Sequence, residues 1–293
     1  MATTHPLARA SFAATLTVAA VLVIVLVPDA VQAYAPSLIG TLRAPGEPAF
    51  VAGHRGDRAD APENTLPAFE AAFASGLDVV ETDVQLTADG VPVLLHDPTV
   101  DRTTNGSGAV ADLTLEQVQS LDAGSWFGDE FAGTRIPQLA ELLDLLAATP
   151  HKRALVELKG YWSQDGIRRV LADVYARGVQ NRIVFAGIHL GTIQNLADAA
   201  PAIPRVIIRR DLPADPVGLA QFYGAIAIMT SPWSLETYPH AVADMHAAGL
   251  GVLVYTLNSE KRWTEATSYG VDGIVTDAPS ALDGWLAQTA PGT

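Results

Sequence analysis

The 293-residue chain contains no cysteine. Disulfide bonds, thiolate metal ligands, thiol nucleophiles and a lipid-modified cysteine are therefore all excluded. Any metal ion bound by the protein must be held by oxygen atoms or by histidine nitrogens. The 49% of hydrophobic residues are enough to build one large core in a chain of this length.

Positive charge is also scarce. The chain has 18 Lys and Arg against 32 Asp and Glu, a formal net charge of −14, and the cations form no run. This balance argues against a nucleic acid as partner, because a phosphate backbone is bound by clustered cations. An anionic ligand would need local positive charge, from a bound metal ion or from a few placed cations.

The N-terminal residues have the layout of a secretory signal. His5 and Arg9 precede an apolar run from about Ala10 to Val27, and residues 31–33 (Val-Gln-Ala) offer a small-residue cleavage site. We therefore expect residues 1–33 to be a signal peptide and the protein to be secreted or to lie in the cell envelope. The alternative is an uncleaved membrane anchor, since the run is about long enough to span a bilayer. Contact with a membrane is expected only in that case.

The remaining chain reads as one α/β domain. We expect a lead-in over residues 34–48 and a domain over residues 49–290, close to the roughly 250 residues of an eight-stranded β/α barrel. The predicted strands are Phe50–His54, Val79–Val84, Ala154–Lys159, Arg182–Ala186, Arg205–Arg209, Ala225–Thr230, Gly251–Leu257 and Gly273–Asp277. The predicted helices between them include Leu66–Ser75, Gln138–Ala148, Asp165–Arg177, Thr192–Ala199, Tyr238–Ala248 and Lys261–Tyr269.

This alternation predicts parallel strands. An open doubly wound sheet is the alternative, but eight units without a glycine-rich dinucleotide fingerprint favour a closed TIM (β/α)8 barrel.

One apolar run, Val91–Leu95, does not fit the alternation, because it follows the second strand after a link far too short for a parallel crossover. We predict that it is the return arm of a hairpin with an Asp-Gly turn. Symmetric pairing about that turn would place His96 near Glu81 and Leu94 near Asp83.

Residues 98–137 lack sustained periodicity and are too long for a simple connection. We expect an insertion that covers or flanks the substrate cleft and contains a short helix around Leu115–Leu121. Trp126 and Phe127 could line the cleft; alternatively, they bury the insertion against the barrel.

Ionisable side chains gather at the ends of the predicted strands, which converge on one face of a barrel. Glu81 and Asp83 lie two residues apart and so point to the same side of their strand, and Glu157 ends the third strand. Three carboxylates at one point repel unless a cation lies among them, and Ca²⁺ or Mg²⁺ takes such ligands. We predict that these three residues hold a divalent cation. The alternative is a salt-bridge network in which Arg55 and Lys159 neutralise the acids.

Two histidines, His54 and His96, end predicted strands where imidazoles would face the cleft. They suit one general acid and one general base; which histidine does which is open. Glu63, just before the first helix, is predicted as a metal ligand or as a neighbour of the ligands, although residues 63–65 could simply cap that helix. With Arg55 to grip an anion, the set suggests metal-assisted cleavage of a phosphate ester.

In this order, the residues closely resemble the motifs of the glycerophosphodiester phosphodiesterase family. The motifs are His54-Arg55-Gly56, Pro62-Glu63-Asn64-Thr65, Glu81-x-Asp83, His96-Asp97, residues 102–106, Glu157-Leu158-Lys159 and residues 270–277, within a match from about Phe50 to Leu282. The resemblance implies a TIM-like barrel that hydrolyses glycerophosphodiesters to an alcohol and sn-glycerol 3-phosphate with a divalent metal ion. It also implies roles: His54 and His96 as the acid/base pair, Glu81, Asp83 and Glu157 as metal ligands, and Arg55 and Lys159 as phosphate or glycerol contacts.

Two positions depart from the family's pattern at the expected pocket wall. Ala186-Gly187 replaces a Ser-Phe pair, and Tyr255 replaces a Trp. Tyr255 is therefore a candidate substrate contact, and Trp126 of the insertion is another. A lipid-directed lysophospholipase D or sphingomyelinase D-like enzyme is a rival, as is an exported module that binds glycerophosphodiesters without cleaving them. The nucleophile, water or the glycerol 2-hydroxyl of the substrate, is also open.

Overall fold

The structure is a computed structural model, and it describes residues 42–289. The expected signal peptide and the first part of the expected lead-in lie outside the described residues. Residues 42–49 form neither helix nor strand and lead into the first strand. Between residues 42 and 289, no helix is both long enough and apolar enough to cross a membrane.

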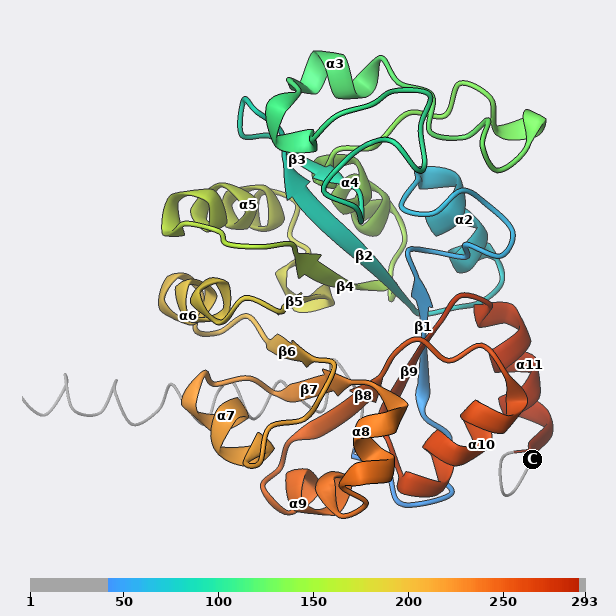
Figure 1. The fold of residues 1–293 in the computed structure, drawn as a ribbon, viewed down its shortest axis with the longest axis vertical. Coiled ribbons are helices and arrows are strands. Elements are labelled where there is room, and N and C mark those ends of the chain that lie inside the picture. The colour runs from blue at the N-terminus through green and yellow to red at the C-terminus, as the bar shows by residue number, and fades with distance from the viewer. Residues whose placement is uncertain (1–41, 290–293) are drawn as a thin grey trace, which may run out of the picture.

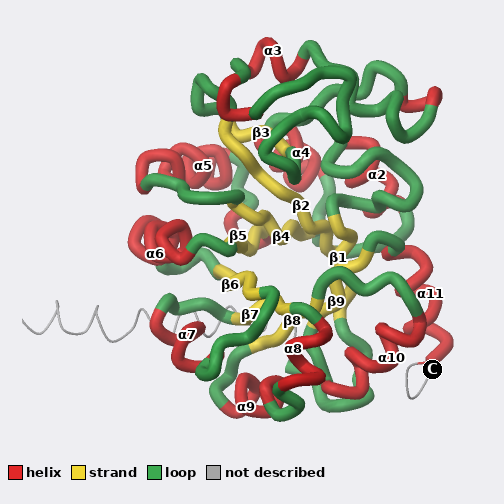
Figure 2. The backbone as a smooth tube through the Cα atoms, viewed as in Figure 1, coloured by secondary structure: helices red, strands yellow, loops and turns green. Residues whose placement is uncertain are grey.

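Eight parallel strands form a closed barrel, which Figure 2 shows as a central ring of strands with the helices outside it. The strands are β1 (Phe50–His54), β2 (Val79–Leu86), β4 (Arg153–Leu158), β5 (Ile183–Gly187), β6 (Arg205–Arg209), β7 (Ala227–Thr230), β8 (Gly251–Val254) and β9 (Gly273–Thr276). Because β1 pairs with both β2 and β9, the ring has no free edge. The predicted barrel is confirmed, and the open doubly wound sheet is excluded.

Helices surround this ring (Figure 1). They are α2 (Leu66–Ala74), α3 (Leu115–Gln119), α4 (Leu139–Ala148), α5 (Gln164–Ala176), α6 (Leu190–Ala199), α7 (Pro216–Phe222), α8 (Pro232–Thr237), α9 (Ala241–Ala247), α10 (Glu260–Tyr269) and α11 (Pro279–Thr289), with short 3₁₀ turns at Val110–Asp112, Asp129–Phe131 and Gln180–Arg182. Three of them, α7, α8 and α11, were not predicted. Each begins at a proline, which fits the first turn of a helix because no backbone N–H is needed there.

The inner faces of the strands explain where polar chemistry can be placed. Alternate residues point into the barrel, and most of them form an apolar cluster that includes Val79 and Leu155. Two residues further along β2, the inward-facing side chain after Val79 is Glu81, and two residues further along β4, the one after Leu155 is Glu157. The barrel interior is therefore apolar at its amino-terminal end and acidic at its carboxyl-terminal end.

The predicted hairpin is confirmed, because β3 (Pro92–Leu94) pairs antiparallel with the outer part of β2. Its predicted register was wrong by one residue. Leu94 lies opposite Val84, and the Leu95 N–H donates to the Asp83 carbonyl at 3.0 Å. The link is one residue longer than expected, since the Thr87 N–H donates to the Val91 carbonyl at 3.1 Å and so closes a five-residue loop.

The insertion extends outward from this hairpin, at the top of Figure 1. It carries a small apolar core of its own, formed by Val93, Leu95, Val100, Val110, Val118, Ala123 and Ile136. The predicted short helix is present as α3, and its N-terminus has a reciprocal capping box between Thr114 and Gln117. The insertion therefore folds around its own core beside the barrel.

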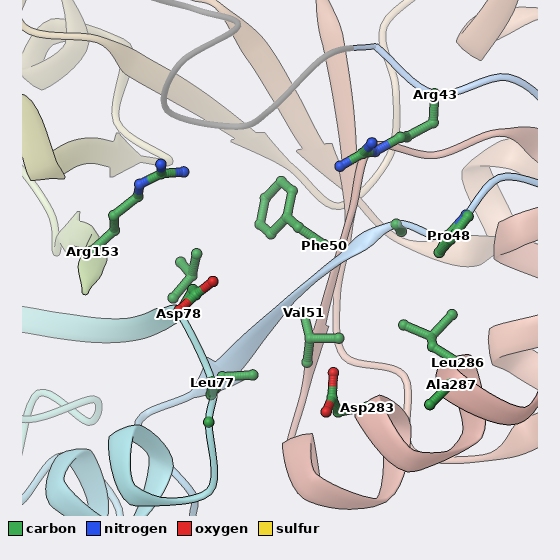
Figure 3. A pocket seen from close by; sticks show the side chains of 13 residues that line it. Arg43, Pro48, Phe50, Val51, Leu77, Asp78, Arg153, Asp283, Leu286 and Ala287 are labelled. Carbon is green, nitrogen blue, oxygen red and sulfur yellow. The ribbon is translucent and has the colours of Figure 1, made fainter. Parts of the chain in front are cut away.

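A cavity of about 460 Å³ lies at the amino-terminal ends of β1 and β2. In Figure 3, Arg43 and Arg153 extend from opposite sides towards the ring of Phe50, and Asp78 lies nearby. In barrels of this type the reactive groups lie at the other end. The smaller cavity at the carboxyl-terminal ends, which collects the ionisable side chains, is therefore the candidate site.

Candidate active site

A cavity of about 170 Å³ lies at the carboxyl-terminal ends of the strands. It is lined by His54, Arg55, Glu81, Asp83, His96, Glu157, Lys159, Ile188, Ile208, Met229, Tyr255, Thr256 and Val275. The structure thus brings together all the predicted site residues except Glu63 and Trp126. The expected return of His96 to the rim that carries Glu81 is part of this arrangement.

Strand register explains why these residues meet. His54 at the end of β1 lies opposite Glu81 on β2, and Asp83, two residues further along, lies opposite Glu157 on β4. Side chains directly opposite one another on neighbouring strands lie on the same face of the sheet. Four residues from three separate strands therefore point into the barrel mouth together.

The three carboxylates form a compact cluster. Glu81, Asp83 and Glu157 each offer an oxygen atom, and these atoms lie within 4.8 Å of one another. All three residues are buried, and Glu157 Oε1 has no hydrogen-bond partner among the described residues. Burial, with repulsion from Asp83 and Glu157, raises the pKa of Glu81 well above its ordinary value. This donor set fits a hard divalent cation.

Two cations contact the cluster. Lys159 Nζ lies 2.8 Å from Asp83 Oδ1 and 2.9 Å from Glu157 Oε2, and Arg55 Nε lies 3.2 Å from Asp83 Oδ2. Burial opposes ionisation of Asp83, but attraction to Lys159 and Arg55 outweighs it and lowers the Asp83 pKa. The salt-bridge alternative is thus physically present, yet two cations do not neutralise three carboxylates, particularly since Arg55 also pairs with Glu63.

The turn after β1 places Arg55 among the acids. Arg55 has a left-handed backbone conformation (φ 60°), which is costly for a residue with a side chain, and its N–H donates to Glu81 Oε2 at 3.1 Å. Gly56 follows with φ 87°, and a Cβ there would lie 2.7 Å from the backbone carbon of Ala68. In the His-Arg-Gly sequence, the glycine is therefore needed for the backbone conformation and the close approach to α2, while the histidine and the arginine supply the reactive side chains.

Each histidine is paired with an aspartate through its Nδ1 atom. His54 Nδ1 lies 2.6 Å from Asp277 Oδ1, and His96 Nδ1 lies 2.6 Å from Asp97 Oδ1. His54 Nε2 lies 4.0 Å from Glu81 Oε2 and so faces the carboxylate cluster. Burial lowers the pKa of both imidazoles, although their aspartate partners oppose that shift. An acidic partner on Nδ1 fixes the tautomer and leaves Nε2 for proton transfer.

Several residues that hold the site in place were given no role from the sequence. Asn64, expected as a possible helix cap, instead donates to Asp83 Oδ2 at 3.0 Å and accepts from the Thr82 hydroxyl at 2.8 Å. Thr65 occupies the N-cap position of α2, but its hydroxyl donates to the Pro62 carbonyl and makes no cap. The capping interpretation of these two side chains was therefore wrong.

Asp97 and Asp277 were also given no role, although signals for them exist. Asp97 directly follows a candidate histidine, and Asp277 comes directly after the last strand, whose end converges with that of β1. A carboxylate at either place is a natural partner for imidazole Nδ1.

Glu63 lies away from the carboxylate cluster. Its two oxygens contact three arginines: Arg55 Nη1 at 2.6 Å, Arg58 Nη2 at 2.9 Å, and both terminal nitrogens of Arg102 at 2.7 and 2.9 Å. Burial would raise the Glu63 pKa, but these arginines reverse the shift and lower it. The structure thus gives Glu63 the place of a neighbour of the site, and it does not bring Glu63 to the position of a metal ligand.

Trp126 is not brought to the cavity. It is 42% exposed, its Nε1 donates to the Ala123 carbonyl at 2.9 Å, and its ring lies edge-on to Phe127. Phe127 in turn packs edge-on against Phe131. These aromatic side chains pack against one another within the insertion.

The arrangement combines three chemical capacities in one small cavity: oxygen ligands for a cation, positive side chains for an anion, and two oriented imidazoles for proton transfer. A phosphate ester held between the imidazoles would have a proton acceptor and a proton donor within the same site.

Comparison with known proteins agrees with this chemistry. Residues 54–281 match the Glycerophosphoryl diester phosphodiesterase family. The Bacillus subtilis protein YhdW is 36% identical over 239 residues, which cover 80% of this chain and 96% of that protein. A glycerophosphodiester phosphodiesterase from Caldanaerobacter subterraneus is 34% identical over 237 residues, with coverage of 80% and 96%. The structure of an Oleispira antarctica phosphodiesterase in complex with the product sn-glycerol-3-phosphate superimposes with a TM-score of 0.71 at 26% identity, covering 81% of this chain and 96% of that one.

Proposed function

The chain belongs to the glycerophosphoryl diester phosphodiesterase family, and on that premise we propose that it hydrolyses glycerophosphodiesters to an alcohol and sn-glycerol 3-phosphate. The observation that carries the proposal is the convergence of two histidine–aspartate pairs on one cavity with a carboxylate triad. The product bound to the Oleispira relative supports the same substrate class. The family resemblance predicted from the sequence motifs is confirmed.

In this proposal, Glu81, Asp83 and Glu157 hold a divalent cation, Ca²⁺ or Mg²⁺. Bound there, the cation supplies positive charge that stabilises negative charge on the phosphate oxygens. Two features of the chain support the assignment: the unpartnered Glu157 Oε1 and the raised pKa of Glu81. A cation would relieve both, because it ligates the free oxygen and offsets the repulsion among the acids.

Arg55 and Lys159 contact the phosphate or the glycerol of the substrate in this scheme. Both line the cavity, and Lys159 already spans Asp83 and Glu157, so its ammonium group lies where an anion would meet the cation site. Burial by itself would lower the pKa of Lys159, but attraction to these two carboxylates and the hydrogen bonds to them outweigh it and raise that pKa. Lys159 therefore stays charged at neutral pH and can neutralise a phosphate oxygen.

The two histidines carry the protons. One imidazole Nε2 takes the proton from the attacking oxygen, and the other gives a proton to the oxygen of the departing alcohol. Because both have an aspartate on Nδ1, either can fill either role. The attacking oxygen is water or the glycerol 2-hydroxyl; in the second case the alcohol leaves as a cyclic glycerol phosphate forms, and water then opens that ring to give sn-glycerol 3-phosphate. A substrate analogue without that hydroxyl separates them: continued cleavage selects water, and loss of cleavage selects the hydroxyl.

A headgroup panel with metal titration tests the proposed function. We expect release of sn-glycerol 3-phosphate from glycerophosphocholine in the presence of Ca²⁺ or Mg²⁺, and loss of that release in chelator. No product from any glycerophosphodiester would contradict the proposal. Much faster turnover of lysophosphatidylcholine than of glycerophosphocholine would favour the lipid-directed rival, and tight substrate binding without product would favour a binding module.

The wall of the cavity gives a second prediction. Tyr255→Ala should raise KM because Tyr255 lines the cavity, whereas Trp126→Ala should leave kcat/KM near the wild-type value, because Trp126 is not among the residues that line it. Steady-state kinetics on one glycerophosphodiester compare the two variants. A large KM effect in Trp126→Ala would restore the sequence-based assignment of Trp126 as a substrate contact.

We propose in addition that the protein is exported, on the basis of the charged start and apolar run within residues 1–33. The mass of the protein recovered outside the cytoplasm tests this. A chain shortened by about 33 residues, as the proposed cleavage site requires, supports a cleaved signal. A full-length chain in the membrane fraction supports the anchor.

A further inference from the structure

One carboxylate joins the two histidine–aspartate pairs behind the cavity. On one side, Arg58 lies 2.9 Å from Glu63 Oε2 through Nη2 and 3.4 Å from Asp277 Oδ1 through Nη1. On the other side, Arg102 donates both terminal nitrogens to Glu63 and donates from Nε to Asp97 Oδ2 at 2.6 Å. Glu63 is therefore the centre of a continuous chain of contacts that runs from one pair to the other.

Glu63 has no capacity left for a ligand. Its oxygens accept three hydrogen bonds, one from Arg55 and two from Arg102, and Oε2 also forms an ion pair with Arg58, while a carboxylate offers about four acceptor positions. The residue is 5% exposed, and it is not among the residues that line the cavity. Any effect of Glu63 on the reaction must therefore pass through its arginine partners.

The arginines connect loop residues that are not themselves part of any strand. Arg58 belongs to the segment between β1 and α2 and reaches Asp277 after β9. Arg102 belongs to the insertion and reaches Asp97 after β3. A guanidinium group is a rigid planar fork, so its two ends move together. A displacement of Glu63 would therefore move both aspartates, and a displacement of one arginine would reach the far side through Glu63.

We propose that Glu63 is a positioning residue that couples His54 to His96, acting through Arg58 on Asp277 and through Arg102 on Asp97. The functional part rests on the proposed acid/base role of the histidines. Glu63 touches neither imidazole. In this arrangement the two proton-transfer groups are held at a fixed separation by one shared support, and neither can be disturbed alone.

Nuclear magnetic resonance of ¹⁵N-histidine tests the coupling without any assumption about activity. The ring nitrogens of His54 and His96 are observed through the carbon-bound ring protons and assigned with His54→Gln and His96→Gln. We expect Arg58→Met to shift the nitrogens of distant His96 as well as those of His54, and Arg102→Met to shift those of His54 as well as those of His96. Arg177→Met, which removes an arginine paired with Asp144 on the outer helices, is the matched control and should shift neither.

Glu63→Gln should shift both histidines, because glutamine has one acceptor oxygen and adds two donors that face the arginines. If that variant fails to fold, the two arginine variants still decide. If each arginine variant shifts only the nearer histidine, the proposal is overturned. Arg102 would then only hold the insertion in place.

Kinetics supply the second readout. Arg58→Met and Arg102→Met should each lower kcat by about 10- to 100-fold, as for other residues that orient a catalytic group, with little change in KM because neither lines the cavity. The double variant should lose much less than the product of the two single losses. If the loss of kcat in the double variant equals the product of the two single losses, Arg58 and Arg102 act independently and the coupling is refuted. If the wild type cleaves no glycerophosphodiester, the proposed function fails, and the resonance shifts still decide the coupling.

Discussion

Replacing either His54 or His96 by glutamine is expected to lower kcat by about 10²- to 10⁴-fold, the usual contribution of a positioned acid or base. Glutamine keeps a polar side chain but cannot cycle a proton near neutral pH. Both imidazoles are oriented through Nδ1 by an aspartate at 2.6 Å, so each loss should fall on kcat more than on KM. Release of sn-glycerol 3-phosphate from glycerophosphocholine measures it.

His240→Gln is the control, because His240 is exposed at the start of α9 and lies outside the cavity. It should retain the wild-type rate and the wild-type melting temperature. The assignment of the acid and base would be wrong if His54→Gln and His96→Gln retained near wild-type rates while folding normally. If one variant lost activity and the other did not, a single histidine would have to serve both steps.

The second large effect concerns stability without metal. Glu81→Gln is expected to raise the free energy of unfolding of the metal-free protein at neutral pH by about 1 to 3 kcal/mol, the order of the penalty for an uncompensated buried polar group. The neutral amide removes the repulsion with Asp83 and Glu157, and its carbonyl oxygen can still accept the Arg55 N–H that Glu81 binds. Activity should be lost, because Glu81 is one of the three proposed ligands of the divalent cation.

The pH dependence has a defined sign. The folded-state pKa of Glu81 is raised above its ordinary value of 4.5, first by burial and then by the two neighbouring carboxylates. The native state then binds this proton more tightly than the unfolded state does. The protonation of Glu81 therefore adds to the free energy of unfolding. This added stability is fully present below about pH 4.5 and is lost as the pH rises through the folded-state pKa. Thermal unfolding in chelator, followed upward from about pH 4.5, should show this decline in the wild type and a flatter profile in Glu81→Gln.

Added Ca²⁺ or Mg²⁺ should stabilise the wild type much more than Glu81→Gln. The wild type should gain stability, because the ion binds only the folded state, and Glu81→Gln should gain little. Glu141→Gln, which changes a helix-capping carboxylate on α4, controls for general effects of charge removal and should respond to the ions as the wild type does. If Glu81→Gln were less stable than the wild type in chelator, repulsion among the three acids could not be what destabilises the metal-free protein.

The barrel was predictable because its signals are local and repeated. Runs such as Phe50–His54 and Arg205–Arg209 are apolar and bounded by turn residues, and their observed limits agree with the prediction. The carboxylate triad was predictable for a related reason. Two acids spaced by two residues share a face of their strand, and the carboxyl-terminal ends of barrel strands converge, so Glu157 had to lie near them.

The support of the site was not predictable in the same way. The pairing of His54 with Asp277 joins residues 223 positions apart, and Arg102 reaches Glu63 from the insertion, 39 positions away. No spacing rule connects such residues before the fold is known. The hairpin register failed for a smaller reason: one backbone hydrogen bond from Thr87 to Val91 lengthened the loop, and a single added residue displaces every later pair.

The seam between β1 and β9 has a consequence for synthesis. His54 is made early, but its orienting partner Asp277 comes directly after the last strand of the barrel. A chain still on the ribosome, or one released before residue 277, would carry His96, the carboxylate triad and Lys159 and yet hold an imidazole with no fixed tautomer. Catalytic competence would then appear only when the ring is closed. Enzymatic activity would therefore require synthesis at least as far as Asp277, and a chain terminated before that residue would lack the orienting partner of His54.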